Sequence, residues 1–249
     1  MACQPALHGQ DASYGRRAPR ASWLPRPELR YRERCSRQSC SATPPRERIR
    51  RDPFPREARM SWIRSIEPDA AQAPLAELYR NIRDRSPRKR VANLWSAHGL
   101  DPSGLRTTYD HYRAMMEEPA PLGAAQAEMI ALVVSATNGC AYCVAHHGPR
   151  LARALGDEQL ARAVARDYRE ADLKAHDRVL LDYAVALTCE PSERKREDVE
   201  RVREYGFDDQ AILKATELTA YYNLVNRVAS GLGVELEADV EPWEFGSQR

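Results

Sequence analysis

The sequence predicts an all-α domain preceded by a disordered Arg- and Pro-rich N-terminal extension. From residue 60 onward, apolar residues recur at helical spacing, and no segment shows the alternation of a half-buried strand. Turn and capping residues divide this part of the chain into helices short enough for a compact bundle. Residues 1–59, in contrast, hold 8 of the 17 prolines and almost no apolar periodicity. We therefore expect a helical domain over residues 60–240 and a short C-terminal tail over 241–249.

The N-terminal extension differs from the domain in charge as well as in pattern. Residues 1–59 contain 14 Arg and no Lys against 6 Asp and Glu. They carry too few apolar side chains to offset the entropy of ordering, so we expect disorder. An Arg-rich tail can bind nucleic acid or an anionic surface, and Arg-rich transit peptides exist. Because prolines interrupt these arginines, we expect no nucleic-acid partner. The patterned domain begins at once with Met60, which favours Met60 as the natural start.

The distribution of apolar residues indicates the cellular location of the protein. No run reaches the ~18 consecutive apolar residues of a membrane-spanning helix, and the N-terminus lacks the apolar core of a secretory signal. We therefore expect a cytoplasmic protein without a membrane partner. Two of the six cysteines form a Cys-x-x-Cys pair. In a reducing cytosol such a pair is more often catalytic or metal-binding than structural.

The expected helices follow one another from residue 69 to residue 231. In the first half, periodicity and stop signals predict helices over 69–85 before Pro87, over 91–98 before Gly99, from a cap at Asp101 or Ser103 to about 118, and over 123–136 before Asn138-Gly139. In the second half they predict helices over 140–155 before Gly156, over 158–168 after a cap at Asp157, over 173–188 after Asp172, over 193–205 after a cap at Ser192, and from Asp208 or Asp209 to about 231. The last helix is apolar on more than one side, which predicts burial by the bundle centre or by a neighbouring subunit.

One stretch of the sequence has the parts of a redox site. Glu128 is followed after eleven residues by Cys140, and Cys143 and His147 come three and seven residues later. Two thiols at this spacing lie on one helix face and can close a disulfide. His147, four residues beyond Cys143, shares that face and can take a thiol proton. Glu128 can hold the far nitrogen of the imidazole and raise its basicity.

The break at Asn138-Gly139 favours this chemistry in two ways. It places both thiols in the first turn of a helix, where free backbone N–H groups and the helix dipole favour a thiolate. It also folds the Glu128 helix back beside the cysteine helix. Tyr142 and His146 adjoin the motif residues and are expected in a supporting shell, with His146 turned about 100° from His147.

Two other interpretations of these residues remain open. Cys-x-x-Cys pairs also bind zinc, but a structural zinc site needs about four ligands, and only the two cysteines and one of the two adjacent histidines are local. Asn223, Asn226 and Arg227 are polar residues in the last helix. They should bond a neighbouring subunit, a helix end or the redox pocket, since unpaired buried polar groups are costly. Packing and assembly are favoured for them over chemistry.

The spacing Glu-x11-Cys-x2-Cys-x3-His resembles the signature of the AhpD-like alkylhydroperoxidases within the carboxymuconolactone decarboxylase superfamily. The match holds at Glu128, Cys140, Cys143 and His147. The opening at residues 60–63 and the runs at 222–227 and 231–234 look like the peroxidase-related branch of that family. The resemblance covers roughly residues 60–240 and implies an AhpD-like helical bundle.

The resemblance also implies roles for the site residues. Cys143 would be oxidised to sulfenic acid, and Cys140 would donate a proton and then close a redox disulfide with Cys143. His147 and Glu128 would form the proton relay. Neither a metal nor an organic cofactor is implied, and members form homo-oligomers, commonly trimers or hexamers. Some members carry a histidine where this chain has Tyr142, and a phenol with a pKa near 10 cannot replace that base at pH 7.

The leading functional hypothesis is an oxidoreductase, a thiol peroxidase that reduces H2O2 or organic hydroperoxides through a dithiol–disulfide cycle. By family analogy, its reductant would be a thioredoxin-like protein or a lipoyl carrier. A dithiol disulfide reductase or adaptor is the first alternative. A non-enzymatic, redox-sensing oligomeric protein is the second.

Overall fold

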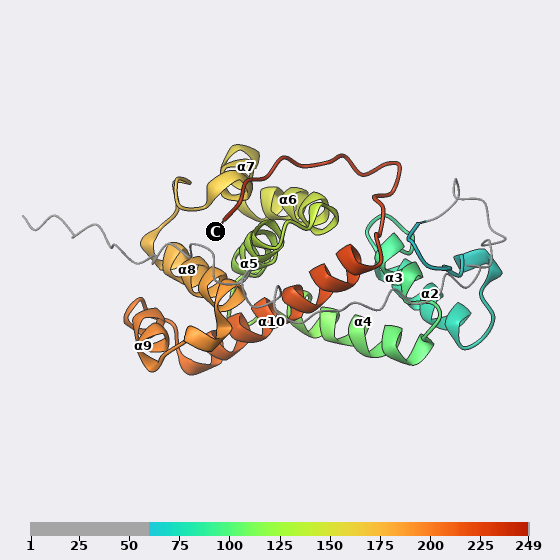
Figure 1. Ribbon diagram of the computed structural model, residues 1–249, viewed down its shortest axis with the longest axis horizontal. Helices are drawn as coiled ribbons and strands as arrows, with labels where there is room; N and C mark the ends of the chain where they lie inside the picture. The colour runs from blue at the N-terminus through green and yellow to red at the C-terminus, as the bar shows by residue number, and fades with distance from the viewer. Residues whose placement is uncertain (1–59, 249) are drawn as a thin grey trace, which may run out of the picture. The chain divides into compact units, whose positions relative to one another are not determined.

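The computed structural model describes residues 60–248, and the predictions for residues 1–59 lie outside them. Every regular element between residues 60 and 248 is a helix, which confirms the predicted all-α class (Figure 1). The elements are the 3-10 turns η2 (Pro68–Ala70) and η3 (Pro191–Glu193) and the helices α2 (Leu75–Arg85), α3 (Asn93–Ala97), α4 (Pro102–Met116), α5 (Ala124–Thr137), α6 (Ala141–Leu155), α7 (Glu158–Asp167), α8 (Ala175–Cys189), α9 (Arg196–Glu204) and α10 (Asp209–Gly231). No helix in the described part of the chain is long and apolar enough to cross a membrane.

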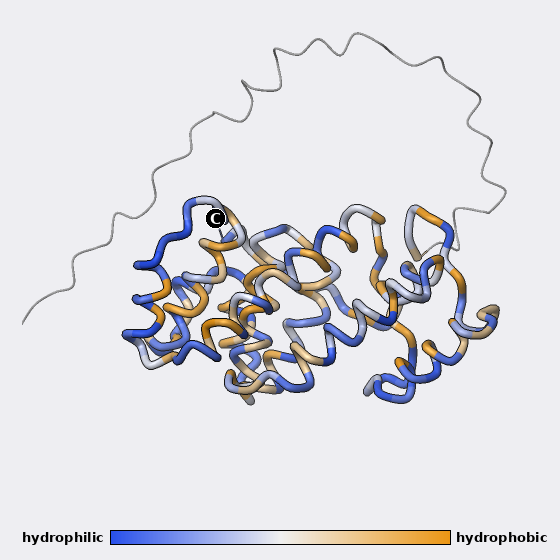
Figure 2. The backbone as a smooth tube through the Cα atoms, turned by 90° about the horizontal axis from the view of Figure 1, so that it is seen from below, coloured by the Kyte–Doolittle hydropathy of each residue, from blue (hydrophilic) through white to orange (hydrophobic). Residues whose placement is uncertain are grey.

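Helix α5 forms the centre of the bundle. Its residues are apolar on all sides, and from Met129 to Thr137 every one of them is buried. It packs against α6, α7, α8 and α10, and more lightly against α4. The outer helices show hydrophobic stretches alternating with hydrophilic ones (Figure 2). This is the arrangement expected when one fully apolar helix is covered by amphipathic ones.

Three predicted helix starts are confirmed by capping bonds, and one predicted helix end by its glycine. The side chains of Asp101, Asp157 and Asp208 accept hydrogen bonds from the backbone N–H groups of Gly104, Leu160 and Ala211, at 3.0, 2.9 and 2.8 Å. Each bond satisfies a donor that the first helical turn leaves free. Gly156, with a φ of +68°, ends α6 in the left-handed region that favours glycine.

Three predicted helix starts are wrong. Helix α2 begins at Leu75 instead of residue 69, because a residue before proline avoids the helical region and Pro74 cannot donate a helical hydrogen bond. Helix α8 begins at Ala175, after an extended Lys174. Ser192 does not cap α9 but lies within the 3-10 turn η3. The start of α9 is fixed from inside the helix, where the Asp198 carboxylate accepts from the Lys195 N–H at 2.9 Å.

Helix α10 is buried on one side only within the described chain. It packs against α5 and α8 and touches α4, α9 and α6. On its opposite side Leu213 and Leu224 are 58% and 48% exposed. The bundle therefore accounts for one of its two apolar sides, and cover by a neighbouring subunit stays a prediction for the other.

The residues after α10 return across α6 and α7 (Figure 1). Trp243 packs against Gly148 so closely that a Cβ at that position would collide with the indole ring. Further on, the Gly246 N–H donates to the Ala165 carbonyl at 3.1 Å, and Gln248 is fully buried. This C-terminal segment covers the helix that carries the cysteine pair.

Candidate active site

The turn between α5 and α6 positions the dithiol. Asn138 continues the helical conformation, and Gly139 then takes a φ of +69°, which glycine adopts without strain. The Cys140 N–H donates back to the Ser135 carbonyl at 2.9 Å and closes the end of α5. Helix α6 starts at the next residue, so α5 and α6 lie side by side as the sequence predicts.

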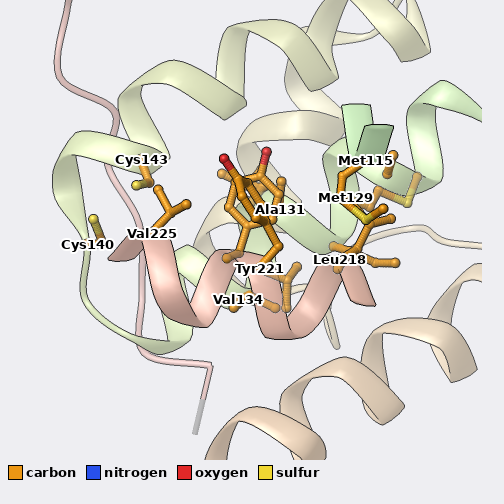
Figure 3. Packing of buried hydrophobic residues seen from close by; sticks show 14 of the residues in the cluster. Met115, Met129, Ala131, Val134, Cys140, Cys143, Leu218, Tyr221 and Val225 are labelled. Atoms are coloured by element: carbon orange, nitrogen blue, oxygen red, sulfur yellow. The ribbon is translucent and has the colours of Figure 1, made fainter. Parts of the chain in front are cut away.

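Both thiols of the pair are buried at the start of α6. Cys140 is the residue that precedes the first helical turn, one position earlier than predicted, and Cys143 lies within that turn. Each is 2% exposed, and the two sulfurs are not bonded to each other. Figure 3 shows them beside the C-terminal half of α10, close to Val225. The prediction that the turn brings both thiols to one place is thus met by the geometry.

The two thiols differ in acidity. The pKa of Cys140 is lowered to about 7, mainly because the Cys143 thiol hydrogen-bonds to it, with smaller contributions from Ser230 and Asn226. The pKa of Cys143 is raised well above its usual value, because its proton is held in that bond and because burial disfavours its charge. Cys140 is therefore the thiol of the pair that ionises first, although the helix start was expected to favour either thiolate.

Asn226 of α10 connects the turn to the dithiol. Its amide donates to the Ser135 hydroxyl at 3.0 Å, and its carbonyl oxygen accepts from Asn138 at 2.9 Å. Its side chain also lowers the pKa of both thiols through hydrogen bonds. Of the uses that the sequence left open for Asn226, its bonds serve both the helix end at Asn138 and the redox pocket. A buried asparagine in an apolar helix was the available signal.

Its helix neighbours Asn223 and Arg227 lie farther out. Asn223 accepts from Asn138 at 3.1 Å and from the Arg227 guanidinium at 2.7 Å. These two residues therefore brace the α5–α6 turn from outside the site.

The predicted pair of Glu128 and His147 is present. Nδ1 of His147 lies 2.7 Å from a carboxylate oxygen of Glu128, and both side chains are largely buried between α5 and α6. Burial lowers the pKa of His147 more than the Glu128 charge raises it. Because a carboxylate only accepts, Nδ1 carries the proton and Nε2 of the neutral ring is left as a base. The ring edge packs on Tyr222 at 4.8 Å between centroids.

A second carboxylate–histidine pair was not predicted. Glu237, in the segment after α10, accepts from Nε2 of His146 at 3.0 Å and from the Tyr142 hydroxyl at 2.9 Å. It also accepts from the Asn93 N–H at 2.8 Å. These bonds outweigh burial and lower the pKa of Glu237 to about 2. Tyr142 and His146 are thus held by Glu237, and no local spacing in the sequence joins positions 91 residues apart.

A small cavity joins the two pairs to the dithiol. It has a volume of about 60 Å³, and its lining includes Cys143, His146, His147, Arg150, Tyr112 and Tyr222. Cys140 is not part of the lining. Cys143 and His147 therefore both border the cavity, whereas Cys140 does not. No group of three or more His, Cys, Asp or Glu residues suited to a metal ion occurs between residues 60 and 248.

Comparison with known proteins agrees with this fold and site. The carboxymuconolactone decarboxylase family matches residues 102–169, which run from α4 through α7 and include the whole motif. An uncharacterized peroxidase-related protein from Silicibacter sp. TM1040 is 31% identical, with a TM-score of 0.63 over 68% of this chain and 90% of that one. The alkylhydroperoxidase AhpD core protein from Ralstonia eutropha JMP134, also peroxidase-related, is 27% identical, with a TM-score of 0.67 over 73% and 94%.

A more distant structure shares the fold alone. The debrominase Bmp8, solved with 2,3,4-tribromopyrrole, is 18% identical, with a TM-score of 0.60 over 72% of this chain and 94% of that one. No curated protein matches the chain.

The chain is an all-helical bundle of the AhpD-like fold, with a buried cysteine pair beside a carboxylate-held histidine. The chain belongs to the AhpD-like proteins of the carboxymuconolactone decarboxylase superfamily. Members of this superfamily are enzymes, and the peroxidase-related proteins are among them.

Proposed function

We propose that the protein is a thiol-dependent peroxidase that reduces H2O2 or organic hydroperoxides through a Cys140–Cys143 dithiol–disulfide cycle. The observation that supports it most is the arrangement at the cavity. The sulfur of Cys143 lines it, the neutral base His147 lies on the same wall, and Cys140 is hydrogen-bonded to Cys143 from behind. These are the nucleophile, the base and the resolving thiol that the reaction needs.

The reaction begins with a proton transfer between the two sulfurs. The proton on Cys143 moves to Cys140 along their hydrogen bond, or to Nε2 of His147, and leaves a thiolate facing the cavity. This thiolate attacks the terminal peroxide oxygen, so that an S–O bond forms and the O–O bond breaks. The departing alkoxide or hydroxide takes up a proton from Cys140 or His147. Cys143 is left as the sulfenic acid.

The second step closes the disulfide. Cys140 attacks the sulfur of the Cys143 sulfenic acid, the S–S bond forms, and the hydroxyl group leaves as water with a proton that His147 takes up from solvent. The peroxide has then been reduced by two electrons and the dithiol oxidised by two. An external dithiol, which we propose to be a thioredoxin-like protein or a lipoyl carrier, reduces the disulfide by exchange. No step requires a metal or an organic cofactor.

Rapid mixing of the reduced protein with H2O2 and with cumene hydroperoxide tests the assignment. We expect stoichiometric loss of peroxide, and mass spectrometry should find a Cys140–Cys143 disulfide. Cys143→Ser should abolish peroxide loss. The matched control is Cys189→Ser, which changes a cysteine at the exposed end of α8 and should leave the rate unchanged. Undiminished turnover in Cys143→Ser would contradict the proposal.

The same protein tests the two alternatives. A disulfide reductase would reduce a protein disulfide much faster than either peroxide. A redox sensor would change its assembly on oxidation while turning over negligibly. Burial of both sulfurs at 2% exposure supports a small oxidant over a protein disulfide.

We also propose that the protein forms a homo-oligomer, a trimer or a hexamer. The exposed leucines Leu213 and Leu224 on the outer side of α10 support this, because a second copy can cover them. Mass measurement in solution tests it, and a monomer at micromolar concentration would overturn it.

A further inference from the structure

Arg150 is a cation in the cavity wall without a carboxylate partner. It lies on α6, seven residues beyond Cys143, and its guanidinium donates to the Tyr112 hydroxyl at 2.8 Å. Among residues 60–248, no carboxylate comes within 4.0 Å of its nitrogens, and Tyr112 is the only side chain that accepts from it. A guanidinium has five N–H donors, so most of its hydrogen-bonding capacity is unused by the described chain.

Both carboxylates at the cavity have other partners. Glu128 is bound to His147 at 2.7 Å, and Glu237 is bound to His146 and Tyr142 at 3.0 and 2.9 Å. Neither forms a hydrogen bond or an ion pair with Arg150, although the nearby charge of Glu128 raises the pKa of the guanidinium. Arg150 therefore has a negative charge in its surroundings, but most of its N–H groups have no acceptor among the described residues, and buried donors are costly to leave unpaired.

Tyr222 adds a second unused donor in the same wall. Its hydroxyl is buried, and no described residue hydrogen-bonds to it. The ring itself is fixed by its contact with His147, so the hydroxyl stays in place. Buried hydroxyl groups in proteins are nearly always satisfied, and an exception in a cavity wall is available to a bound water, ion or ligand. A hydroxyl and a guanidinium together fit an anionic acceptor.

We propose that Arg150 and Tyr222 bind a carboxylate of the substrate, so that the preferred oxidant is a short hydroperoxide that carries a carboxylate close to its peroxide group. This inference rests on the proposed peroxidase function and names its substrate class. Seven residues on a helix span about 10 Å, and a helical side chain leans back toward the N-terminus. A molecule with few atoms between carboxylate and peroxide therefore spans Arg150 and the Cys143 sulfur. The carboxylate is unchanged in the reaction, which otherwise proceeds as above.

A matched pair of hydroperoxides tests the proposal with the wild-type protein. In 2-hydroperoxy-2-methylpropanoate, a carboxylate replaces one methyl group of tert-butyl hydroperoxide. We expect the reduced protein to react at least about tenfold faster with the carboxylate compound, once both rates are divided by those of dithiothreitol. An equal or slower reaction with the carboxylate compound, or a reaction with H2O2 alone, would overturn the inference. If none of the three peroxides reacts, the peroxidase proposal itself fails.

Variants of the two residues test which groups cause the preference. In Arg150→Gln the ratio of the two corrected rates should fall toward one, and Arg150→Lys should keep part of it. Tyr222→Phe removes a hydroxyl without a described partner, so it should fold normally and lower the ratio about threefold. The matched control is Arg153→Gln, which removes the same charge from an exposed position on the same helix and should leave the ratio unchanged. A preserved ratio in well-folded Arg150→Gln would contradict the assignment.

Discussion

The two carboxylate–histidine pairs of the cavity involve neighbouring histidines but differ in construction. His147 is bound to Glu128, 19 residues earlier on the adjacent helix, and that carboxylate makes no other hydrogen bond with a described residue. His146 is bound to Glu237, 91 residues later, and this carboxylate also holds Tyr142 and the backbone of Asn93. The first pair leaves a base at the dithiol. The second attaches the chain end to the bundle. Chemically similar pairs can thus serve catalysis and architecture side by side.

The largest expected difference between the pairs is in catalysis. His147→Asn should lower the rate of Cys143 oxidation by H2O2 about 10²- to 10³-fold, because a positioned base contributes about that much. His146→Asn is the matched change on the neighbouring residue and should lower the rate less than about fivefold. Rapid-mixing kinetics on both variants, with circular dichroism to check folding, measures the difference. If the oxidation rate falls equally in the two variants, the Glu128–His147 pair has no catalytic role that the Glu237–His146 pair lacks.

The second difference is in stability. Glu237→Gln should lower the free energy of unfolding at pH 7 by about 3.5 kcal/mol, whereas Glu128→Gln should act mainly on the rate. The pKa of Glu237 is lowered from 4.5 to about 2, and about 1.4 kcal/mol corresponds to each pH unit. A depressed folded-state pKa stabilises the protein above the unfolded-state value, and the effect disappears as the pH falls through about 2.

Urea titrations between pH 7 and pH 2 test this. The wild-type protein should lose stability steadily below about pH 4.5, and Glu237→Gln should lose about 2–3 kcal/mol less over the same range. If the free energy of unfolding falls equally with pH in the wild type and the variant, Glu237 does not cause the acid sensitivity.

The sequence predicts the Glu128–His147 pair of this site but not the Glu237–His146 pair. Glu128, Cys140, Cys143 and His147 lie within one helical hairpin, so helical periodicity and the turn at Asn138-Gly139 were enough to bring them together. The helix starts that failed depend on prolines and on Asp198, which caps from inside the helix.

The missing parts of the site come from tertiary packing. Glu237 and Asn226 contact the site residues from other elements, and their roles and that of Arg150 depend on which hydrogen-bond partners are already in use. Sequence spacing carries no such information. It also could not show which of two adjacent cysteines holds the charge, because that depends on one hydrogen bond between two buried sulfurs.

The next effect concerns the pH dependence of the dithiol near the first pair. The pKa of Cys140 is about 7. The dithiol, whose two sulfurs share a hydrogen bond, therefore becomes reactive as the pH rises through about 7. The oxidation rate should therefore increase about tenfold from pH 6 to its plateau. In Cys140→Ser the midpoint should move above the usual cysteine value, because the thiol left to titrate is Cys143, and its burial raises its pKa. An unchanged midpoint in Cys140→Ser would assign the titration to another group.

The smallest expected effect decides to which pair Tyr142 belongs. Its hydroxyl donates to Glu237 at 2.9 Å and accepts from the Leu94 N–H at 3.2 Å, and its ring packs on His146. Both hydroxyl bonds are therefore used within the architectural pair, although the residue lies between the two cysteines. Tyr142→Phe should cost about 1 kcal/mol of stability, as expected for the loss of buried hydrogen bonds, and should change the H2O2 rate less than threefold. If Tyr142 instead donates to the peroxide, the rate falls at least about tenfold while stability changes as before. The two readouts in one variant, urea unfolding and rapid-mixing kinetics, separate an anchoring phenol from one that acts on the substrate.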